Sequence, residues 1–296
     1  MTSAAWRHWV EAARPKTLPA AVIPVLVGTA VAAAHRAADF GKALVCLAFA
    51  LLVQIGTNFA NDYFDFVQGA DTPARVGPRR AVAAGLIAPA TMLRATWFVL
   101  GAAFLVGLLL VRDGGWGLLP VGVISIACAI AYTGGPFPLG YNGLGDLFVF
   151  IFFGLVAVDA TFYVQAGGLS PDATSCAAAV GLLAANILVA NNYRDAETDA
   201  RAGKKTLVVR FGRRFALWQY GLSNLVAMLC PPALLLYGYR WPVLAPLVLV
   251  PWAMRLTHRL GASVDPAEQI ALLGSTAKYL AVFGGLLAAG VVAGRW

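Results

Sequence analysis

Two acidic segments contain the residues of this sequence that are best suited to chemistry. The first reads Asn61-Asp62-Tyr63-Phe64-Asp65, and the second reads Asn191-Asn192-Tyr193-Arg194-Asp195 with a further acid at Asp199. Asp195 and Asp199 are four residues apart, so a helix places both carboxylates on one face, one turn from each other. Such a pair suits a hard divalent cation such as Mg²⁺, which takes one or two carboxylates and fills its other positions with water and phosphate oxygens.

Basic side chains follow both acidic segments and are suited to phosphate binding. The first segment is followed by Asp71 and by Arg75, Arg79 and Arg80, and the second by Arg201, Lys204 and Lys205. Each segment also ends an apolar run. Two matched acidic segments therefore predict two half-sites that face one phosphate-bearing substrate. The alternative, two ordinary solvated helix caps, does not explain why the N-x-Y-x-D spacing occurs twice.

The composition places these half-sites in a polytopic membrane protein. Of the 296 residues, 60% are hydrophobic and 12% are charged, whereas soluble domains carry about 25% charged residues. The mean hydropathy is +0.74. The net charge of +8 could indicate nucleic-acid binding, but its distribution along the chain favours membrane orientation instead. We therefore expect the lipid bilayer, and no nucleic acid, among the partners.

Apolar stretches of about 17–25 residues are long enough to cross a membrane as helices. Nine occur, which predicts an all-α bundle of nine transmembrane helices forming a single domain over residues 1–296. The stretches are residues 18–35, 42–60, 92–111, 116–133, 146–166, 174–192, 215–237, 241–257 and 269–293.

The distribution of Lys and Arg predicts the orientation of this bundle. With the N-terminus in the cytoplasm, sixteen basic residues fall in cytoplasmic segments and five fall outside, as the positive-inside rule requires. Both acidic segments then open to the cytoplasmic side, and the C-terminus lies outside. This arrangement predicts an integral protein of a bacterial-type cytoplasmic (inner) membrane.

A lipid diphosphate is the substrate class that fits acids, bases and apolar helices together. Metal ions would neutralise the diphosphate, and the lipid tail would lie among the helices. Stabilising the charge on a departing diphosphate assists C–O cleavage. An allylic chain would leave as a carbocation that an electron-rich acceptor captures. The sequence shows no convincing Ser/His/Asp or Cys/His set for nucleophilic catalysis.

These motifs carry a family resemblance. Asn61-Asp62-x-x-Asp65, together with Asp195-x₃-Asp199 and Arg201-x-Gly203-Lys204-x-Thr206, resembles the UbiA superfamily of intramembrane aromatic prenyltransferases. The resemblance implies a nine-helix enzyme that uses Mg²⁺ and a prenyl diphosphate. Further segments resemble the branch that prenylates 1,4-dihydroxy-2-naphthoate in menaquinone biosynthesis. They are residues 13–19, 69–80, 132–136, 152–158 and 163–165.

The resemblance also implies residue roles. Asn61, Asp62, Asp65 and Asp71 would hold one Mg²⁺, and Asp195 and Asp199 would hold a second. Substrate-binding residues would be Arg75, Arg79, Arg80, Tyr132, Asn192, Arg201, Lys204 and Lys205. Of these two sets, Asp65, Arg75, Tyr132, Asp199 and Lys204 would be catalytic, and the Tyr132 ring would lie near the carbocation.

The naphthoate would be alkylated at the ring carbon that bears its carboxylate, with loss of CO₂, giving demethylmenaquinone. Homogentisate or 4-hydroxybenzoate is an alternative acceptor, and a membrane lipid carrier or transporter is an alternative function. Two intramembrane charges, Asp159 and Lys278, suggest the separate hypothesis that they form an ion pair or that each faces the polar cavity, because buried charges in membranes are usually paired or functional.

Overall fold

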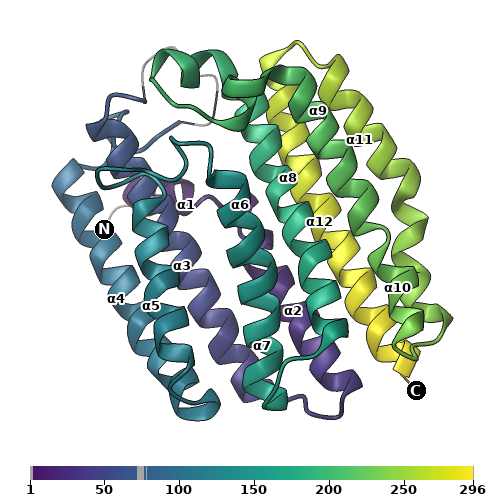
Figure 1. Cartoon of the computed structure of the whole chain (residues 1–296). Coiled ribbons are helices and arrows are strands. Elements are labelled where there is room, and N and C mark those ends of the chain that lie inside the picture. The colour runs from purple at the N-terminus through teal and green to yellow at the C-terminus, as the bar shows by residue number, and fades with distance from the viewer. Residues whose placement is uncertain (1–2, 72–76, 78, 296) are drawn as a thin grey trace.

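Every regular element among the described residues is a helix, which confirms the predicted all-α class (Figure 1). The computed structural model describes residues 3–71, 77 and 79–295. Most elements are α-helices, but η1 and η3 are 3₁₀ helices and η2 is a π-helix. In chain order the elements are α1 (Ser3–Ala13), η1 (Pro15–Thr17), α2 (Pro19–Ala34), α3 (Phe40–Val67), α4 (Pro89–Gly114), α5 (Leu118–Ala131), α6 (Gly145–Val149), η2 (Phe150–Val156), α7 (Ala157–Ala166), α8 (Pro171–Arg201), α9 (Leu207–Ala227), α10 (Cys230–Leu236), η3 (Trp241–Leu249), α11 (Val250–Ala262) and α12 (Pro266–Arg295).

Long apolar helices make up most of the bundle. Six helical segments in the described part of the chain are long and apolar enough to cross a membrane, and the bent pair Trp6–Thr17 and Pro19–Ala34 makes a seventh if it forms one span. The fourth predicted stretch corresponds to α5, whose 14 residues extend about 21 Å, short of the roughly 30 Å hydrocarbon core. The structure thus supports six or seven candidate spans, and the count of nine stays a prediction.

The short helix η1 separates α1 from α2, and α1 ends immediately before Arg14. This residue has a φ of 53°, in the left-handed region that non-glycine residues rarely adopt. Pro15 begins η1 and Pro19 begins α2, the helix position at which the missing proline amide leaves no bond unmade. The helical segments Trp6–Thr17 and Pro19–Ala34 meet at a bend of 52°. Arg14 lines the central cavity described below.

A π-helical segment forms one wall of that cavity. It lies in the continuous helical stretch α6, η2 and α7, and π turns often occur at functional sites. The wall is held against α8 through two glycines. A Cβ on Gly154 would lie 2.6 Å from the Ala177 carbonyl oxygen, and one on Gly181 would lie 2.7 Å from the Phe150 carbonyl oxygen. These helices can approach so closely only because both residues lack side chains.

A buried polar cluster lies at the end of the bundle where α8 begins. Asp172, at the start of α8, accepts hydrogen bonds from Tyr239 at 2.7 Å and from Ser170, and lies 2.8 Å from His35 Nε2. It therefore connects α8 to the end of α2 and to the turn before η3. The C-terminal helix α12 packs beside both α2 and α8 (Figure 1), which brings the two ends of the chain into one bundle.

The hypothesised ion pair between Asp159 and Lys278 is absent from the described residues. The Asp159 carboxylate instead accepts a hydrogen bond from Thr174 Oγ1 at 3.2 Å. Lys278 is exposed on the outer face of α12. The two residues are therefore not partners.

Substituting Gly154 by alanine tests the close packing of η2 on α8. The new Cβ would meet backbone atoms, which cannot move aside cheaply, so we expect a destabilisation of about 1–3 kcal/mol and a lower unfolding temperature in detergent. Gly274→Ala in α12 is the matched control, since nothing lies within 4 Å of its added Cβ, and alanine favours a helix over glycine by about 0.5–1 kcal/mol. Equal unfolding temperatures for the two variants would contradict this account.

Candidate active site

The two acidic segments form the last turns of α3 and α8. Both helices continue beyond their apolar parts, α3 to Val67 and α8 to Arg201. Asn61 and Asp65 are four residues apart on α3, as Asp195 and Asp199 are on α8, so each helix presents one polar face. We call the end of the bundle where α3 and α8 terminate the acidic end.

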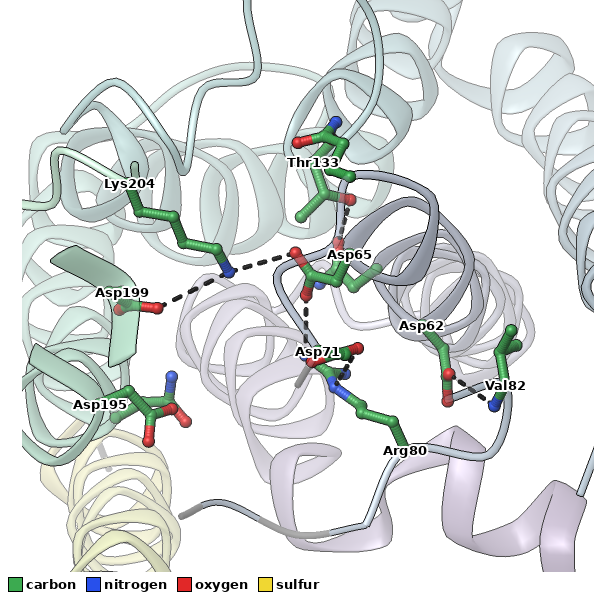
Figure 2. Close-up of polar contacts among 12 residues, drawn as sticks. Asp62, Asp65, Asp71, Arg80, Val82, Thr133, Asp195, Asp199 and Lys204 are labelled. Atoms are coloured by element: carbon green, nitrogen blue, oxygen red, sulfur yellow. Dashed lines mark hydrogen bonds and ion pairs between the residues drawn. The ribbon is translucent and has the colours of Figure 1, made fainter. Parts of the chain in front are cut away.

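Lys204 joins the two half-sites (Figure 2). Its Nζ atom lies 3.1 Å from Asp65 Oδ1 and 3.7 Å from Asp199 Oδ1. Gly203, with a φ of 73°, ends α8 in a left-handed turn, and the Lys204 amide donates back to the Asp199 carbonyl at 2.9 Å. This turn points the lysine across the gap between the helices. The predicted juxtaposition of the two half-sites is therefore present.

Arg80 is the second base in the site. Its Nη2 donates to Asp65 Oδ2 at 2.9 Å, and its Nε lies 3.4 Å from Asp71 Oδ2. The guanidinium is buried, and its Nη1 has no hydrogen-bond partner among the described residues. A buried donor without an acceptor is costly, so this edge of Arg80 suits an additional anionic oxygen.

Asp62 has a role that the sequence did not indicate. Its two carboxylate oxygens accept hydrogen bonds from the backbone amides of Ala81 and Val82, both at 3.0 Å (Figure 2). The side chain is 1% exposed and does not line the cavity. This carboxylate secures the segment that carries Arg80, and the expectation that Asp62 holds a metal ion stays a prediction.

Asp195 is neutralised by the residue next to it. Arg194 donates to Asp195 through Nε at 2.7 Å and through Nη2 at 2.6 Å, and it also bonds Asn191 Oδ1 at 2.8 Å. Arg194 and Asp195 are both buried. The carboxylates of Asp65, Asp195 and Asp199 are thus held in ion pairs with arginine or lysine.

The loop between α5 and α6 covers both half-sites. Thr133 Oγ1 donates to Asn61 Oδ1 at 2.8 Å, and the Tyr141 hydroxyl donates to Asp65 Oδ1 at 2.8 Å. On the other side, the Lys205 amide donates to the Tyr141 carbonyl at 2.7 Å. Burial and the nearby Asp65 charge raise the pKa of Tyr141, so its hydroxyl stays protonated and acts as a donor. The sequence reasoning missed Tyr141, whose only signal was an aromatic residue in a Gly/Pro-rich loop.

Most of the predicted site residues line one cavity of about 330 Å³. Its polar end is lined by Asn61, Asp65, Arg80, Tyr132, Asn192, Asp195, Asp199 and Lys204. Arg79, Arg201 and Lys205 are exposed and lie outside its lining. Their side chains lie on the surface of the acidic end, and their predicted contact with substrate stays a prediction. Arg75 falls outside the described residues.

One face of α3 lines both the polar part and the apolar part of the cavity. Its lining residues recur every three or four positions, as one helix face requires. They are Cys46, Phe49, Ala50, Val53, Gln54, Thr57, Asn58, Asn61 and Asp65, with the polar residues gathered in the second half. The 19 helical steps from Cys46 to Asp65 extend about 28 Å along the helix axis. The cavity can therefore hold a long apolar chain attached to an anionic group.

The donor set fits Mg²⁺ at the polar end. The described residues contain no group of three or more acidic, histidine or cysteine side chains that could enclose a metal ion. Magnesium does not need one, because it is commonly held by one or two carboxylates together with water and substrate phosphate oxygens. Carboxylate and amide oxygens of Asn61, Asp65, Asp195 and Asp199 line the cavity on facing helices, which is the ligand type that this ion prefers.

The structural role of Asp62 can be tested by replacing it with alanine. Two buried backbone amides would lose their acceptor, each at a cost of about 1–3 kcal/mol. We expect faster hydrogen exchange at Ala81 and Val82, with Mn²⁺ affinity reduced much less than in Asp65→Ala. Equal losses of Mn²⁺ affinity in the two variants would indicate that Asp62 is itself a metal ligand.

Comparison with known proteins agrees with this geometry. The chain is 42% identical over 297 residues to the 1,4-dihydroxy-2-naphthoate octaprenyltransferase of Mycobacterium tuberculosis, covering 98% of both chains. It is 36% identical to the Escherichia coli enzyme of the same name, covering 97% of this chain and 96% of that one.

Solved structures show the same fold. A UbiA homologue from Archaeoglobus fulgidus, bound to DMAPP and Mg²⁺, matches with a TM-score of 0.67 at 15% identity, covering 95% of this chain and 99% of that one. The model of the UbiA prenyltransferase family matches residues 21–291. The chain therefore belongs to the UbiA prenyltransferase family.

Proposed function

We propose that this protein transfers a polyprenyl group from polyprenyl diphosphate to 1,4-dihydroxy-2-naphthoate, with loss of CO₂ and release of diphosphate. The product has the demethylmenaquinone skeleton, in its reduced form, and the reaction belongs to menaquinone biosynthesis. The observation that carries the proposal is the cavity, where Lys204 links Asp65 and Asp199 at one end and apolar helices surround the other. The acceptor follows from the relatives' names over nearly the whole chain.

Two Mg²⁺ ions are the proposed cofactor. Asn61 and Asp65 would hold one, and Asp195 and Asp199 would hold the other. When bound, these ions neutralise charge on the leaving diphosphate. Asp71 supports the site indirectly, because it lies against Arg80 Nε and thereby orients the guanidinium.

Lys204 and Arg80 bind the diphosphate oxygens in this proposal. Both line the cavity, and Arg80 Nη1 offers a donor that no described residue uses. Because these donors are already in place before reaction, they stabilise the developing negative charge without reorganisation. The allylic C–O bond then breaks, and the diphosphate keeps the electron pair.

The resulting cation would form beside Tyr132 in this proposal. This tyrosine lines the cavity, and glycines hold its ring: a Cβ on Gly140 would lie 3.1 Å from a ring carbon, and one on Gly145 would lie 2.9 Å from the hydroxyl. An aromatic face attracts a cation within about 6 Å of its centroid. The acceptor carbon that bears the carboxylate forms the new bond to the chain. CO₂ leaves from that carbon, and its bonding pair restores the aromatic ring.

The loop between α5 and α6 excludes water from this step. It is bonded to α3 through Thr133 and Tyr141, and to the segment after α8 through the Lys205 amide. Exclusion of water matters because water would otherwise capture the cation. This loop therefore favours transfer of the prenyl group over its hydrolysis.

We also propose a membrane topology for this chain. We place nine membrane crossings in one domain, with the N-terminus and the acidic end in the cytoplasm of a bacterial-type cell and the C-terminus outside. Its support is the excess of basic residues in the segments that would be cytoplasmic.

Purified protein in detergent, with Mg²⁺ and geranylgeranyl diphosphate, tests the reaction against three acceptors in parallel. We expect dihydroxynaphthoate to give a prenylated product that lacks the carboxylate, detected by mass spectrometry. Product from hydroxybenzoate or homogentisate alone would overturn the choice of acceptor but retain the chemistry. Neither product nor released diphosphate with any acceptor, from folded protein, would favour the carrier alternative.

Replacing Asp65 or Asp199 by asparagine tests the metal site. We expect each change to lower the transfer rate by orders of magnitude, because it removes charge from a site that stabilises the transition state. Chelation by EDTA should abolish activity of the wild type, and added Mg²⁺ should restore it. Asp113→Asn is the matched control, because Asp113 pairs with exposed Arg112 at the end of α4. Near-normal turnover in both site variants would exclude the assigned ligands.

A further inference from the structure

The Tyr141 hydroxyl donates to Asp65, a carboxylate that accepts hydrogen bonds from three side chains. Asp65 Oδ1 accepts from the Tyr141 hydroxyl at 2.8 Å and from Lys204 Nζ at 3.1 Å, while Oδ2 accepts from Arg80 Nη2 at 2.9 Å. Asp65 is 2% exposed. Each carboxylate oxygen has about two lone-pair positions, so both positions on Oδ1 are already occupied.

A divalent cation at Oδ1 can bind only if one of these two donors leaves. Lys204 carries a positive charge, and like charges at short distance repel strongly in a buried site. The Tyr141 hydroxyl is an ordinary phenol, which carries no charge near neutral pH, so a cation does not repel it. Lys204 is therefore the donor that gives way, and it lies between the half-sites where diphosphate oxygens would accept it. The Tyr141 hydroxyl retains its bond.

We propose that Tyr141 is a positioning residue of the metal site, whose hydroxyl holds the Asp65 carboxylate in its ligand orientation when Lys204 moves to the diphosphate. This inference rests on the proposed function, because it assumes that Asp65 is a metal ligand. Carboxylate ligands are commonly oriented by such outer hydrogen bonds, and their removal costs about 10–100-fold in metal affinity or activity.

The hydroxyl can be removed without detaching the loop. The Tyr141 carbonyl bonds the Lys205 amide at 2.7 Å, and the Asn142 carbonyl accepts from Arg210 Nη2 at 2.9 Å. The Tyr141 ring lies 4.5 Å from Lys204 Nζ. None of these contacts uses the hydroxyl, so Tyr141→Phe deletes the bond to Asp65 and retains the others.

Tyr239→Phe is a matched control at the opposite end of the bundle. The Tyr239 hydroxyl donates to buried Asp172 at 2.7 Å, which is the same chemical bond at nearly the same distance. Removing it should lower the unfolding temperature. It should leave metal binding unchanged, because Asp172 does not line the cavity.

The test is Mn²⁺ binding to the full chain in detergent, followed by electron paramagnetic resonance without diphosphate or acceptor. We expect Tyr141→Phe to weaken Mn²⁺ binding about 10–100-fold and Tyr239→Phe to leave it unchanged. Lys204→Met should instead tighten binding, because the ammonium competes for the same oxygen. In transfer assays, saturating Mg²⁺ should restore most of the lost rate in Tyr141→Phe, which a purely structural defect would not allow.

Wild-type affinity in Tyr141→Phe would overturn the inference while leaving the proposed function intact. An equal loss in Tyr239→Phe would also overturn it, because the effect would then be general loosening of the bundle. Absence of Mn²⁺ binding in the wild type would refute the metal site of the proposed function itself, and with it this inference.

Discussion

Asp65 is the buried charge on which the acidic end depends. A carboxylate removed from water is costly unless it is paired and hydrogen-bonded, and Asp65 receives donors from three segments outside α3. Arg80 comes from the segment after the first motif, Tyr141 from the loop after α5, and Lys204 from the turn after α8. One carboxylate therefore connects these three segments to α3, in addition to the backbone bonds that secure the Arg80 segment and the loop.

This constraint explains why the site is ordered before substrate arrives. The acids are neutralised by the cations that the proposed reaction requires, so Lys204 and Arg80 already lie beside the cavity. When the metal ions and the diphosphate bind, the acids pair with the metal ions, and the basic side chains pair with the diphosphate. Little reorganisation is needed at the moment of reaction, which is the condition under which fixed charges stabilise a transition state most effectively.

The rest of the bundle provides a cavity with two different ends. The lining face of α3 is apolar near Cys46 and polar near Asp65, so a single helix matches both parts of a lipid diphosphate. The close contact of Gly154 with α8 keeps the π-helical wall in place. The bend between Trp6–Thr17 and Pro19–Ala34 turns α1 away from α2, and Arg14 contributes a guanidinium to the cavity.

Much of this arrangement follows from local sequence patterns. The acidic motifs, the helical class and the family resemblance depend on spacing and hydropathy, which are properties of neighbouring residues. The metal-ligand expectation for Asp65, Asp195 and Asp199 is compatible with the cavity, and remains a proposal. In contrast, Asp62 reads as an equivalent acid in the sequence, although its carboxylate faces backbone amides.

The sequence by itself determined that this is a helical membrane protein with two matched acidic segments, because helical periodicity and apolar length are encoded locally. Only the tertiary structure decided which charged residues share the cavity. Arg79 and Arg80 are neighbours in the chain, yet one is exposed and the other is buried against Asp65. Tyr141 joins a site made from residues 76 and 63 positions away in sequence. Such pairings depend on how loops fold back over the helix ends, where no repeating pattern records the contact.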